Sequence, residues 1–153
     1  LFDLEDDGNL FYNNGNGLTE TDWIQGSIAF VNDKILEKEK IKFGILLDMV
    51  GGYNAKFKYE SLAYAYYPNI YDKIWEYAKS LGFGNYFINE HYGIITDDHI
   101  PFIMNKIPFI DIIDMDYKYH HTSEDTIDKI DIKTLEAIGF TIEYILKNAD
   151  KIF

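Results

Sequence analysis

The chain has 153 residues, 47% of them hydrophobic and 17% aromatic, which excludes a disordered segment and fits one domain with a packed core. Its 26 acidic and 14 basic residues give a formal net charge of -12, which disfavours nucleic acid and anionic membrane surfaces as partners. This charge favours a cationic ligand such as a peptide amino terminus or a metal ion, unless it serves only to keep the protein soluble. Cysteine is absent, which excludes disulfides and cysteine nucleophiles, and no stretch is long and apolar enough to span a membrane.

The first part of the chain predicts a strand, a loop and a helix. Residues 1–4 are typical of a short buried strand, and the Asn- and Gly-rich residues 9–17 are typical of a loop. Residues 19–22 provide a helix start, and residues 23–31 continue that helix with an apolar face. Residues 33–42 are highly charged and predict a solvated linker or a frayed helix end.

The middle of the chain predicts a buried strand, a helix and a second strand. The continuous apolar run at residues 43–52 is typical of a strand that is buried on both faces. Residues 54–67 are aromatic and fit no single element. Pro68 is well placed at the start of a helix, which ends before Gly82, and residues 85–89 form a further candidate strand.

The last part of the chain predicts two strands and two helices. Residues 93–96 form a β-branched run typical of a strand, and a short helix begins after Asp98. An apolar strand covers residues 107–113, a polar loop reaches Asp128, and Asp131 caps the last helix. The expected core stripe of that helix is Leu135, Ile138, Ile142, Ile145 and Leu146. Alternating strands and helices predict an α/β three-layer sandwich with a mainly parallel, mixed central sheet.

Ionisable side chains follow the predicted strands. Because ligands gather at the carboxyl ends of parallel strands, five groups would converge at one edge of the sheet. These groups are Glu5, Asp6, Asp48, Asp97 and His121. Carboxylate and imidazole are zinc ligands, and a catalytic zinc takes three protein ligands, of which Asp6 and His121 would supply two. The alternative is that each acid only caps a turn or a helix.

Asp48 and the three histidines at 99, 120 and 121 each have a specific structural constraint. Asp48 lies inside an apolar run, where an unpaired charge would be costly to bury. His99 fits a hydrogen-bonded structural histidine better than a metal ligand. His120 and His121 are adjacent, and in an extended segment their side chains point opposite ways, so that only one would face the site.

Five motifs together extend over nearly the whole chain. They are residues 3–8 (Asp-Leu-Glu-Asp-Asp-Gly), 47–52 (Leu-Asp-Met-Val-Gly-Gly), 96–102 (Thr-Asp-Asp-His-Ile-Pro-Phe), 107–108 (Ile-Pro) and 121–125 (His-Thr-Ser-Glu-Asp). Their order and spacing resemble those of the zinc aminopeptidase and glutaminyl cyclase superfamily, and are most similar to bacterial glutaminyl-peptide cyclotransferases. The resemblance implies a single zinc-exopeptidase-like catalytic domain over residues 1–153.

The resemblance also implies a reaction and residue roles. Asp6 and His121 would bind one zinc ion, Glu5 would shuttle protons, and Asp97 with Asp48 would hold the acid network that positions Glu5. The substrate would be the amino terminus of a peptide or protein. Its amino group attacks the side-chain amide of its own first glutamine, which gives pyroglutamate and ammonia while zinc polarises the amide carbonyl. No organic cofactor is implied.

The superfamily contains a second activity. Its aminopeptidases share this layout but use two zinc ions, with Asp48 as a ligand, and carry Ser where this chain has Asp97, so the sequence favours the cyclase. The cyclases usually place Trp where this chain has His120, so either adjacent imidazole could bind the metal. Asp111 matches the bacterial rather than the animal cyclases. Trp23 matches a Trp of bacterial members, or simply packs on its helix.

The chain resembles the carboxy-terminal part of these enzymes. The family's remaining zinc-binding aspartate and first sheet strands precede the motif that contains Glu5 and Asp6. This favours a third hypothesis, an inactive fragment or a non-catalytic binding module that keeps the fold. Bacterial relatives are commonly exported, so a periplasmic or secreted location is expected.

Overall fold

The computed structural model describes residues 23–33 and 40–152. The strand predicted at residues 1–4, the loop and helix start that follow it, and most of the charged linker lie outside the described residues. Glu5 and Asp6 also lie outside them. The structure therefore tests the predictions from Trp23 onward.

The described residues fall into two compact units. The first contains the residues up to Gly44 together with residues 95–109, and the second contains residues 45–94 and those from Ile110 onward. None of the described helices combines the length and the apolar character needed to cross a membrane.

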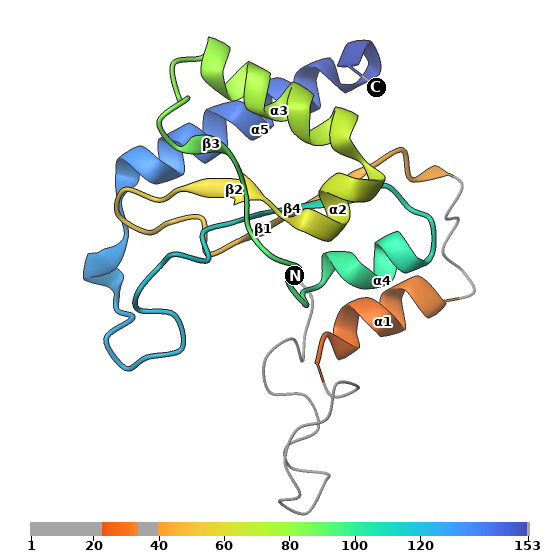
Figure 1. Cartoon of the computed structure of the whole chain (residues 1–153), viewed down its shortest axis with the longest axis horizontal. Helices are drawn as coiled ribbons and strands as arrows, with labels where there is room; N and C mark the ends of the chain where they lie inside the picture. The colour runs from red at the N-terminus through yellow and green to blue at the C-terminus, as the bar shows by residue number, and fades with distance from the viewer. Residues whose placement is uncertain (1–22, 34–39, 153) are drawn as a thin grey trace, which may run out of the picture. The chain divides into compact units, whose positions relative to one another are not determined.

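Two short helices pack together in the first unit. Helix α1 (Gln25–Asn32) and helix α4 (His99–Met104) lie side by side (Figure 1). The rings of Phe30 and Phe102 are 5.7 Å apart between centroids across this contact. Val31, Phe102 and Ile107 form a buried hydrophobic cluster of this unit. The predicted short helix after Asp98 is confirmed.

Helix α1 begins later than the sequence predicts. Ile24 precedes it in the left-handed region at φ 53°, so the helix starts at Gln25. Trp23 therefore lies before the helix and not on it, and its carbonyl accepts a hydrogen bond from Gln25 Nε2 at 3.3 Å. The prediction that Trp23 belongs to the helix is wrong, because a β-branched residue in the left-handed region interrupts the helical backbone.

Four strands form two pairs. Strand β1 (Gly44–Asp48) is hydrogen-bonded to β4 (Phe109–Ile113), and β2 (Phe57–Tyr59) pairs in parallel with β3 (Phe87–His91). Strands β3 and β4 lie within two residues of their predicted bounds, β1 ends four residues before the end of the predicted run 43–52, and the sequence left β2 unassigned. The helices between them give the α/β class that the alternating pattern predicts.

The two strands of the first pair differ in burial. In β4 every residue after Phe109 is buried, as a continuous apolar run predicts. In β1 no residue is buried and Leu47 is 40% exposed, so the prediction of a strand buried on both faces is wrong there. Within the described residues β1 has β4 as its only strand partner, so its other edge pairs with no described strand.

The aromatic residues 54–67 divide into β2 and helix α2 (Ser61–Tyr66). The buried side chain of Glu60 caps this helix by accepting hydrogen bonds from the backbone N–H groups of Leu62 and Ala63, at 3.0 and 2.6 Å. Helix α3 (Pro68–Ser80) begins at proline as predicted.

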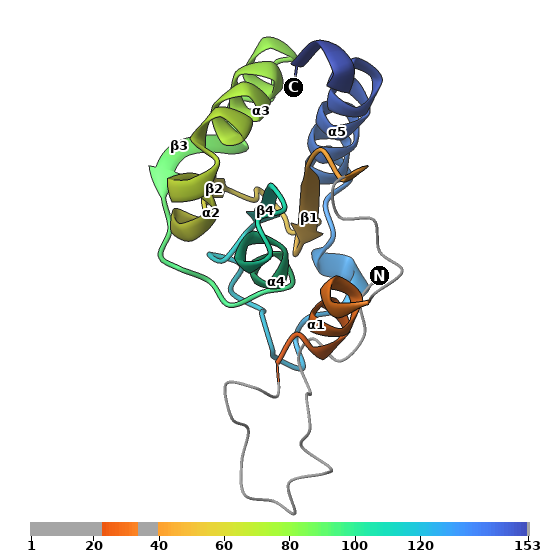
Figure 2. The ribbon, with the colours of Figure 1, turned by 90° about the vertical axis from the view of Figure 1, so that its right-hand side faces the viewer.

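Helix α3 packs its apolar face onto the second unit's strands. Figure 2 shows α3 above β2 and β3. The indole N–H of Trp75 donates to the Ile88 carbonyl at 3.1 Å, and its ring meets that of Phe87 edge-on at 5.0 Å. The buried residues of the helix are Ile70, Tyr71, Ile74, Trp75 and Ala78. The sequence spacing predicts a stripe of Ile70, Ile74, Tyr77, Ala78 and Leu81, of which Ile70, Ile74 and Ala78 are buried, whereas Tyr77 is half-buried and Leu81 is exposed.

Helix α5 (Ile132–Ile152) has its predicted cap but a different buried face. Asp131 Oδ1 accepts a hydrogen bond from the backbone N–H of Lys133 at 3.1 Å, which confirms the cap. The buried residues of its first four turns are Thr134, Ala137, Ile138, Thr141 and Ile145. Leu135 and Leu146, predicted in the core, are 42% and 64% exposed. The inward face therefore combines three small residues with two isoleucines, and the two leucines lie outside it.

The β-branched run at residues 93–96 is not a strand. Strand β3 ends at His91, and the next residues have no regular structure. The Gly93 carbonyl accepts a hydrogen bond from Ser61 N–H at the start of α2, and Ile94 is 71% exposed. This segment is irregular chain between the two units. The prediction of a strand here is wrong, because β-branched composition favours a strand only where another segment can pair with it.

Replacing Tyr71 by Phe is expected to lower the free energy of unfolding by about 1–3 kcal/mol. The Tyr71 hydroxyl is fully buried, donates to the Asp111 carbonyl at 2.8 Å and accepts from the Asp111 N–H at 3.2 Å. The variant would leave both backbone groups of β4 without this partner. Urea unfolding measures the loss, and Tyr66→Phe, whose residue is 58% exposed, is the control with little expected change.

Candidate active site

The first candidate residue, Asp48, lies where β1 ends and the following loop begins. Asp48 is the last residue of β1 and is half-buried, and Met49 follows in the left-handed region at φ 48°. The Gly51 carbonyl accepts a hydrogen bond from the Asp131 N–H at 2.9 Å, which joins this loop to the start of α5. The predicted strand end at Asp48 is confirmed, and its predicted catalytic role stays a prediction.

The first unit buries three consecutive polar residues at the start of α4. Asp97, Asp98 and His99 are 4%, 5% and 0% exposed. Asp97 Oδ1 accepts a hydrogen bond from the Asp98 N–H at 2.6 Å. Burial raises the pKa of the Asp98 carboxyl above its ordinary value, and a hydrogen bond from Ser27 opposes that rise. One ligand atom of Asp97 and one of His99 lie within 4.8 Å of each other.

Burial in this segment agrees with the structural reading of His99. A fully buried imidazole at the first turn of α4 is a core group and does not face solvent. Asp97 is likewise too buried to be an ordinary surface cap. Its buried carboxylate suits a residue that orients another catalytic group, which is the role the resemblance implies for it.

Asp111 lies in the interior of the second unit. It is in the middle of β4, is fully buried, and has both backbone polar groups bonded to the Tyr71 hydroxyl of α3. The predicted substrate-binding role of Asp111 therefore requires a substrate group that reaches a buried carboxylate.

The adjacent histidines lie together in a turn. His120 and His121 are both exposed, and their rings stack with centroids 3.8 Å apart. His121 has a left-handed backbone at φ 54°. The expectation that their side chains point opposite ways is wrong, because that rule holds for extended chain and this segment is a tight turn.

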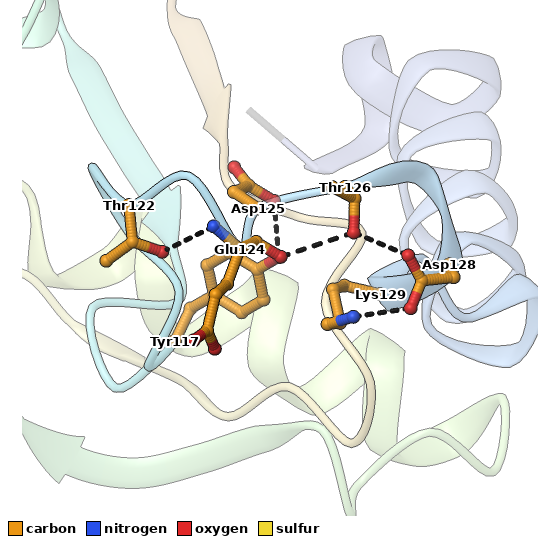
Figure 3. A network of polar contacts seen from close by, with 7 residues as sticks. All are labelled: Tyr117, Thr122, Glu124, Asp125, Thr126, Asp128 and Lys129. Atoms are coloured by element: carbon orange, nitrogen blue, oxygen red, sulfur yellow. Dashed lines mark hydrogen bonds and ion pairs between the residues drawn. The ribbon is translucent and has the colours of Figure 1, made fainter.

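Hydrogen bonds link residues of the loop around these histidines (Figure 3). The Tyr117 hydroxyl donates to Asp125 Oδ1 at 2.5 Å, and Asp128 accepts from both the Thr126 hydroxyl and the Lys129 ammonium. The hydrogen bond to Asp125 raises the pKa of Tyr117 to about 12. The hydrogen bond from the Lys129 ammonium lowers the pKa of Asp128 to about 2. The network ties the two ends of the turn that carries His120 and His121.

The second unit also contains a cavity of about 470 Å³ beside this loop. The segment after β1 and the loop between β4 and α5 form its walls. Its lining includes Tyr53, Lys56, Asp114, Asp116, Tyr117 and Tyr119. Asp114 is 5% exposed and directly follows β4. Asp114 was not among the residues predicted from the sequence, although it carries the same signal as Asp48, an acid at the end of an apolar run.

The Asp114→Asn variant is expected to gain stability relative to the wild type as the pH rises from about 4 to about 7. Burial raises the pKa of the Asp114 carboxyl above its ordinary value, so the native state holds this proton to higher pH than the unfolded state does. Wild-type stability therefore falls across this window, whereas asparagine does not titrate. Urea unfolding at the two pH values measures the difference, and an unchanged difference would contradict the sign.

The predicted site residues are distributed over both units and the undescribed part of the chain. Trp23 and Asp97 belong to the first unit, and Asp48, Asp111, His120 and His121 to the second. Of the two predicted zinc ligands, Asp6 lies outside the described residues and His121 presents an exposed imidazole. Imidazole nitrogen is a donor that zinc accepts, so the described ligand fits this metal.

The model of Peptidase family M28 matches residues 5–146, and the chain belongs to this family. Among solved structures, the glutaminyl cyclase of Tannerella forsythia is 36% identical, with a TM-score of 0.85, and the match covers 97% of this chain and 53% of that one. A leucine aminopeptidase precursor from Bacteroides thetaiotaomicron is 38% identical over 93% of this chain and 49% of that one, with a TM-score of 0.82.

A Zn-dependent exopeptidase from Parabacteroides distasonis is also 38% identical over 83% of this chain and 46% of that one, with a TM-score of 0.77. The chain thus spans about half the length of these solved structures. These likenesses confirm the predicted zinc-exopeptidase-like fold and the resemblance to bacterial glutaminyl cyclases.

Proposed function

We propose that the protein is a glutaminyl-peptide cyclotransferase that converts the amino-terminal glutamine of peptides into pyroglutamate. The observation that carries this proposal is the buried Asp97-Asp98-His99 segment at the start of α4, in a chain 36% identical to a solved glutaminyl cyclase. An aspartate at position 97 is the cyclase form of this motif, whereas the related aminopeptidases carry serine there.

The reaction needs a proton carrier but no water. The substrate's α-amino nitrogen forms a bond to the carbon of its own side-chain amide, and the bond from that carbon to the amide nitrogen breaks, so that ammonia leaves. Glu5 takes a proton from the attacking amine and delivers it to the departing nitrogen. Because both reacting groups belong to one residue, holding them in the reactive conformation supplies much of the rate.

Metal binding would involve two of the chain's own residues. His121, with Asp6, would hold one zinc ion, which when bound polarises the amide carbonyl. Asp97 and Asp48 would orient Glu5 through the acid network. The net charge of -12 attracts the cationic amino terminus of the substrate.

An aminopeptidase is the second candidate function. Its support is the 38% identity to a leucine aminopeptidase precursor. In that case two zinc ions would bind, Asp48 would be a ligand, and water would attack the first peptide bond. A non-catalytic binding module that keeps the fold is the third, and it would retain no zinc.

Mass spectrometry of the peptide Gln-Phe-Ala after incubation with the zinc-loaded protein distinguishes these functions. The cyclase releases ammonia and leaves the peptide otherwise intact, and Glu5→Gln abolishes this. Release of free glutamine would establish the aminopeptidase instead. An unchanged peptide, together with failure of the folded protein to retain zinc, would support the binding module.

A further inference from the structure

Asp98 is a buried acid to which the proposed mechanism gives no role. It directly precedes helix α4, where an aspartate ordinarily caps the helix by accepting hydrogen bonds from the first backbone N–H groups. Its side chain makes no such bond. Instead it is 5% exposed and forms a hydrogen bond with the side chain of Ser27 on α1. Asp98 therefore joins the two helices of the first unit and does not cap α4.

The hydroxyl of Ser27 decides which partner holds the proton of this contact. Ser27 is fully buried, and its Oγ donates to the Ile24 carbonyl oxygen at 2.9 Å. A hydroxyl group has one proton to donate and two lone pairs with which to accept. If it turned that proton to Asp98, two oxygen atoms would stay 2.9 Å apart with no proton between them. With its proton directed at Ile24, Ser27 can only accept, so the proton of the contact belongs to Asp98.

The carboxyl oxygens of Asp98 also fit a neutral acid. Oδ1 is buried and has no hydrogen-bond partner among the residues that the structure describes. The bond with Ser27 is therefore made by the other oxygen, Oδ2. A buried carboxylate with one bare oxygen is costly, whereas a neutral acid leaves only an uncharged carbonyl acceptor unbonded.

The charges around Asp98 favour the neutral form on balance. Asp97 is also buried, and its Oδ1 accepts the Asp98 backbone N–H at 2.6 Å. A second negative charge beside it would be unfavourable, because like charges in a buried site repel. The attraction of His99 favours an ionised Asp98, but burial is the larger effect and raises the Asp98 pKa. A bond from Ser27 could add to that attraction only by withdrawing its proton from the Ile24 carbonyl.

We propose that Asp98 is a neutral carboxylic acid that donates its proton to Ser27 Oγ and thereby positions Asp97. The contact fixes the start of α4 against α1, and the backbone N–H of the same residue holds Asp97 Oδ1. Asp97 then remains the charged acid of the pair. The catalytic part of this inference rests on the proposed function, in which Asp97 orients Glu5. Asp98 acts through Asp97, so it is a positioning residue.

Infrared spectroscopy of the wild type and of Asp98→Asn tests the protonation state without any substrate. A neutral carboxylic acid has a C=O stretching band that a carboxylate lacks. At neutral pH the wild type is expected to show one acid band more than Asp98→Asn, and Asp97→Asn should keep that band. Equal acid bands in the wild type and Asp98→Asn would overturn the proposal. Loss of the band in Asp97→Asn alone would assign the proton to Asp97 and would also overturn it.

Cyclase kinetics test the positioning. Asparagine has the shape of the neutral acid and can donate an N–H to Ser27, so Asp98→Asn should keep kcat within a fewfold of the wild type. Asp98→Ala lacks the contact and should lower kcat by about 10- to 100-fold with little change in KM, because a small displacement of a catalytic group has effects of this size. A kcat as low in Asp98→Asn as in Asp98→Ala would show that the charge is needed and would overturn the proposal.

Ser27→Ala and Ser80→Ala form a matched pair of variants. Both hydroxyls donate to the carbonyl three residues earlier, but Ser27 is buried against Asp98 whereas Ser80 is exposed at the end of α3. Ser27→Ala removes the acceptor of the Asp98 proton and should lower kcat by about 10-fold. Ser80→Ala should leave kcat unchanged. A Ser27→Ala protein with wild-type kcat would overturn the positioning.

If the wild type cyclises no peptide, the proposed function has failed, and nuclear magnetic resonance decides the positioning separately. The amide proton of residue 98 is expected far downfield, because its nitrogen lies only 2.6 Å from Asp97 Oδ1. The signal should stay there in Asp98→Asn and move upfield in Ser27→Ala. An unmoved signal in Ser27→Ala would overturn the positioning. Thermal unfolding checks that each variant is folded.

Discussion

The His121→Ala variant is expected to lose its zinc and to lower cyclase activity by about 100-fold or more. Removing even an outer partner of a ligand typically costs 10- to 100-fold, and the imidazole of His121 is proposed as a direct ligand. Zinc content measured by atomic absorption and the rate of ammonia release give the two readouts.

His120→Ala is the matched control for this prediction. The two imidazoles are adjacent, both exposed, and stacked with centroids 3.8 Å apart, so each variant removes the same chemical group from the same turn. His120→Ala should retain zinc and should change mainly KM, because its ring is expected to contact substrate. Zinc loss in His120→Ala with retention in His121→Ala would reverse the assignment of the ligand.

The Glu5→Gln variant is expected to lower kcat by about 10²- to 10⁴-fold while the protein keeps its zinc. Glutamine has nearly the same size but cannot carry a proton, so it separates proton transfer from metal binding. Ammonia release over a range of pH values is the measurement, and the limb of the profile that reports a deprotonated carboxylate should disappear.

Asp7→Asn controls for the loss of one negative charge near Glu5 in the sequence. It should keep kcat within a fewfold of the wild type, since Asp7 has no proposed role in proton transfer. A Glu5→Gln protein with wild-type kcat would remove Glu5 from the mechanism, and one without zinc would make Glu5 a ligand.

Local rules predicted the elements whose ends are chemically marked. Pro68 begins α3 and Asp131 caps α5, as their residue types predict. The apolar run that contains Asp111 forms β4, which is buried after its first residue as expected. In each case the backbone preference or the cap acts over a few neighbouring residues, so no distant contact is needed to specify it.

Predictions that depended on distant contacts were less accurate. The β-branched residues 93–96 form no strand, because no other segment of the described chain pairs with them. The face of α5 was also misjudged, since packing places Thr134 and Thr141 inside and leaves Leu146 exposed. Hydrophobicity alone does not decide which face of a helix is buried, because that depends on the surfaces of other elements that it packs against.

By itself the sequence determined the family, the order of the α/β elements, and the candidate catalytic motifs, because these follow from local residue patterns. Only the tertiary structure decided that His120 and His121 stack in a turn, that Asp97 is buried, and that Asp114 lines a cavity with Tyr53. Asp114 and Tyr53 are 61 positions apart in the chain, counted from their residue numbers. Their meeting depends on where β1 and β4 end in space, which no local pattern specifies.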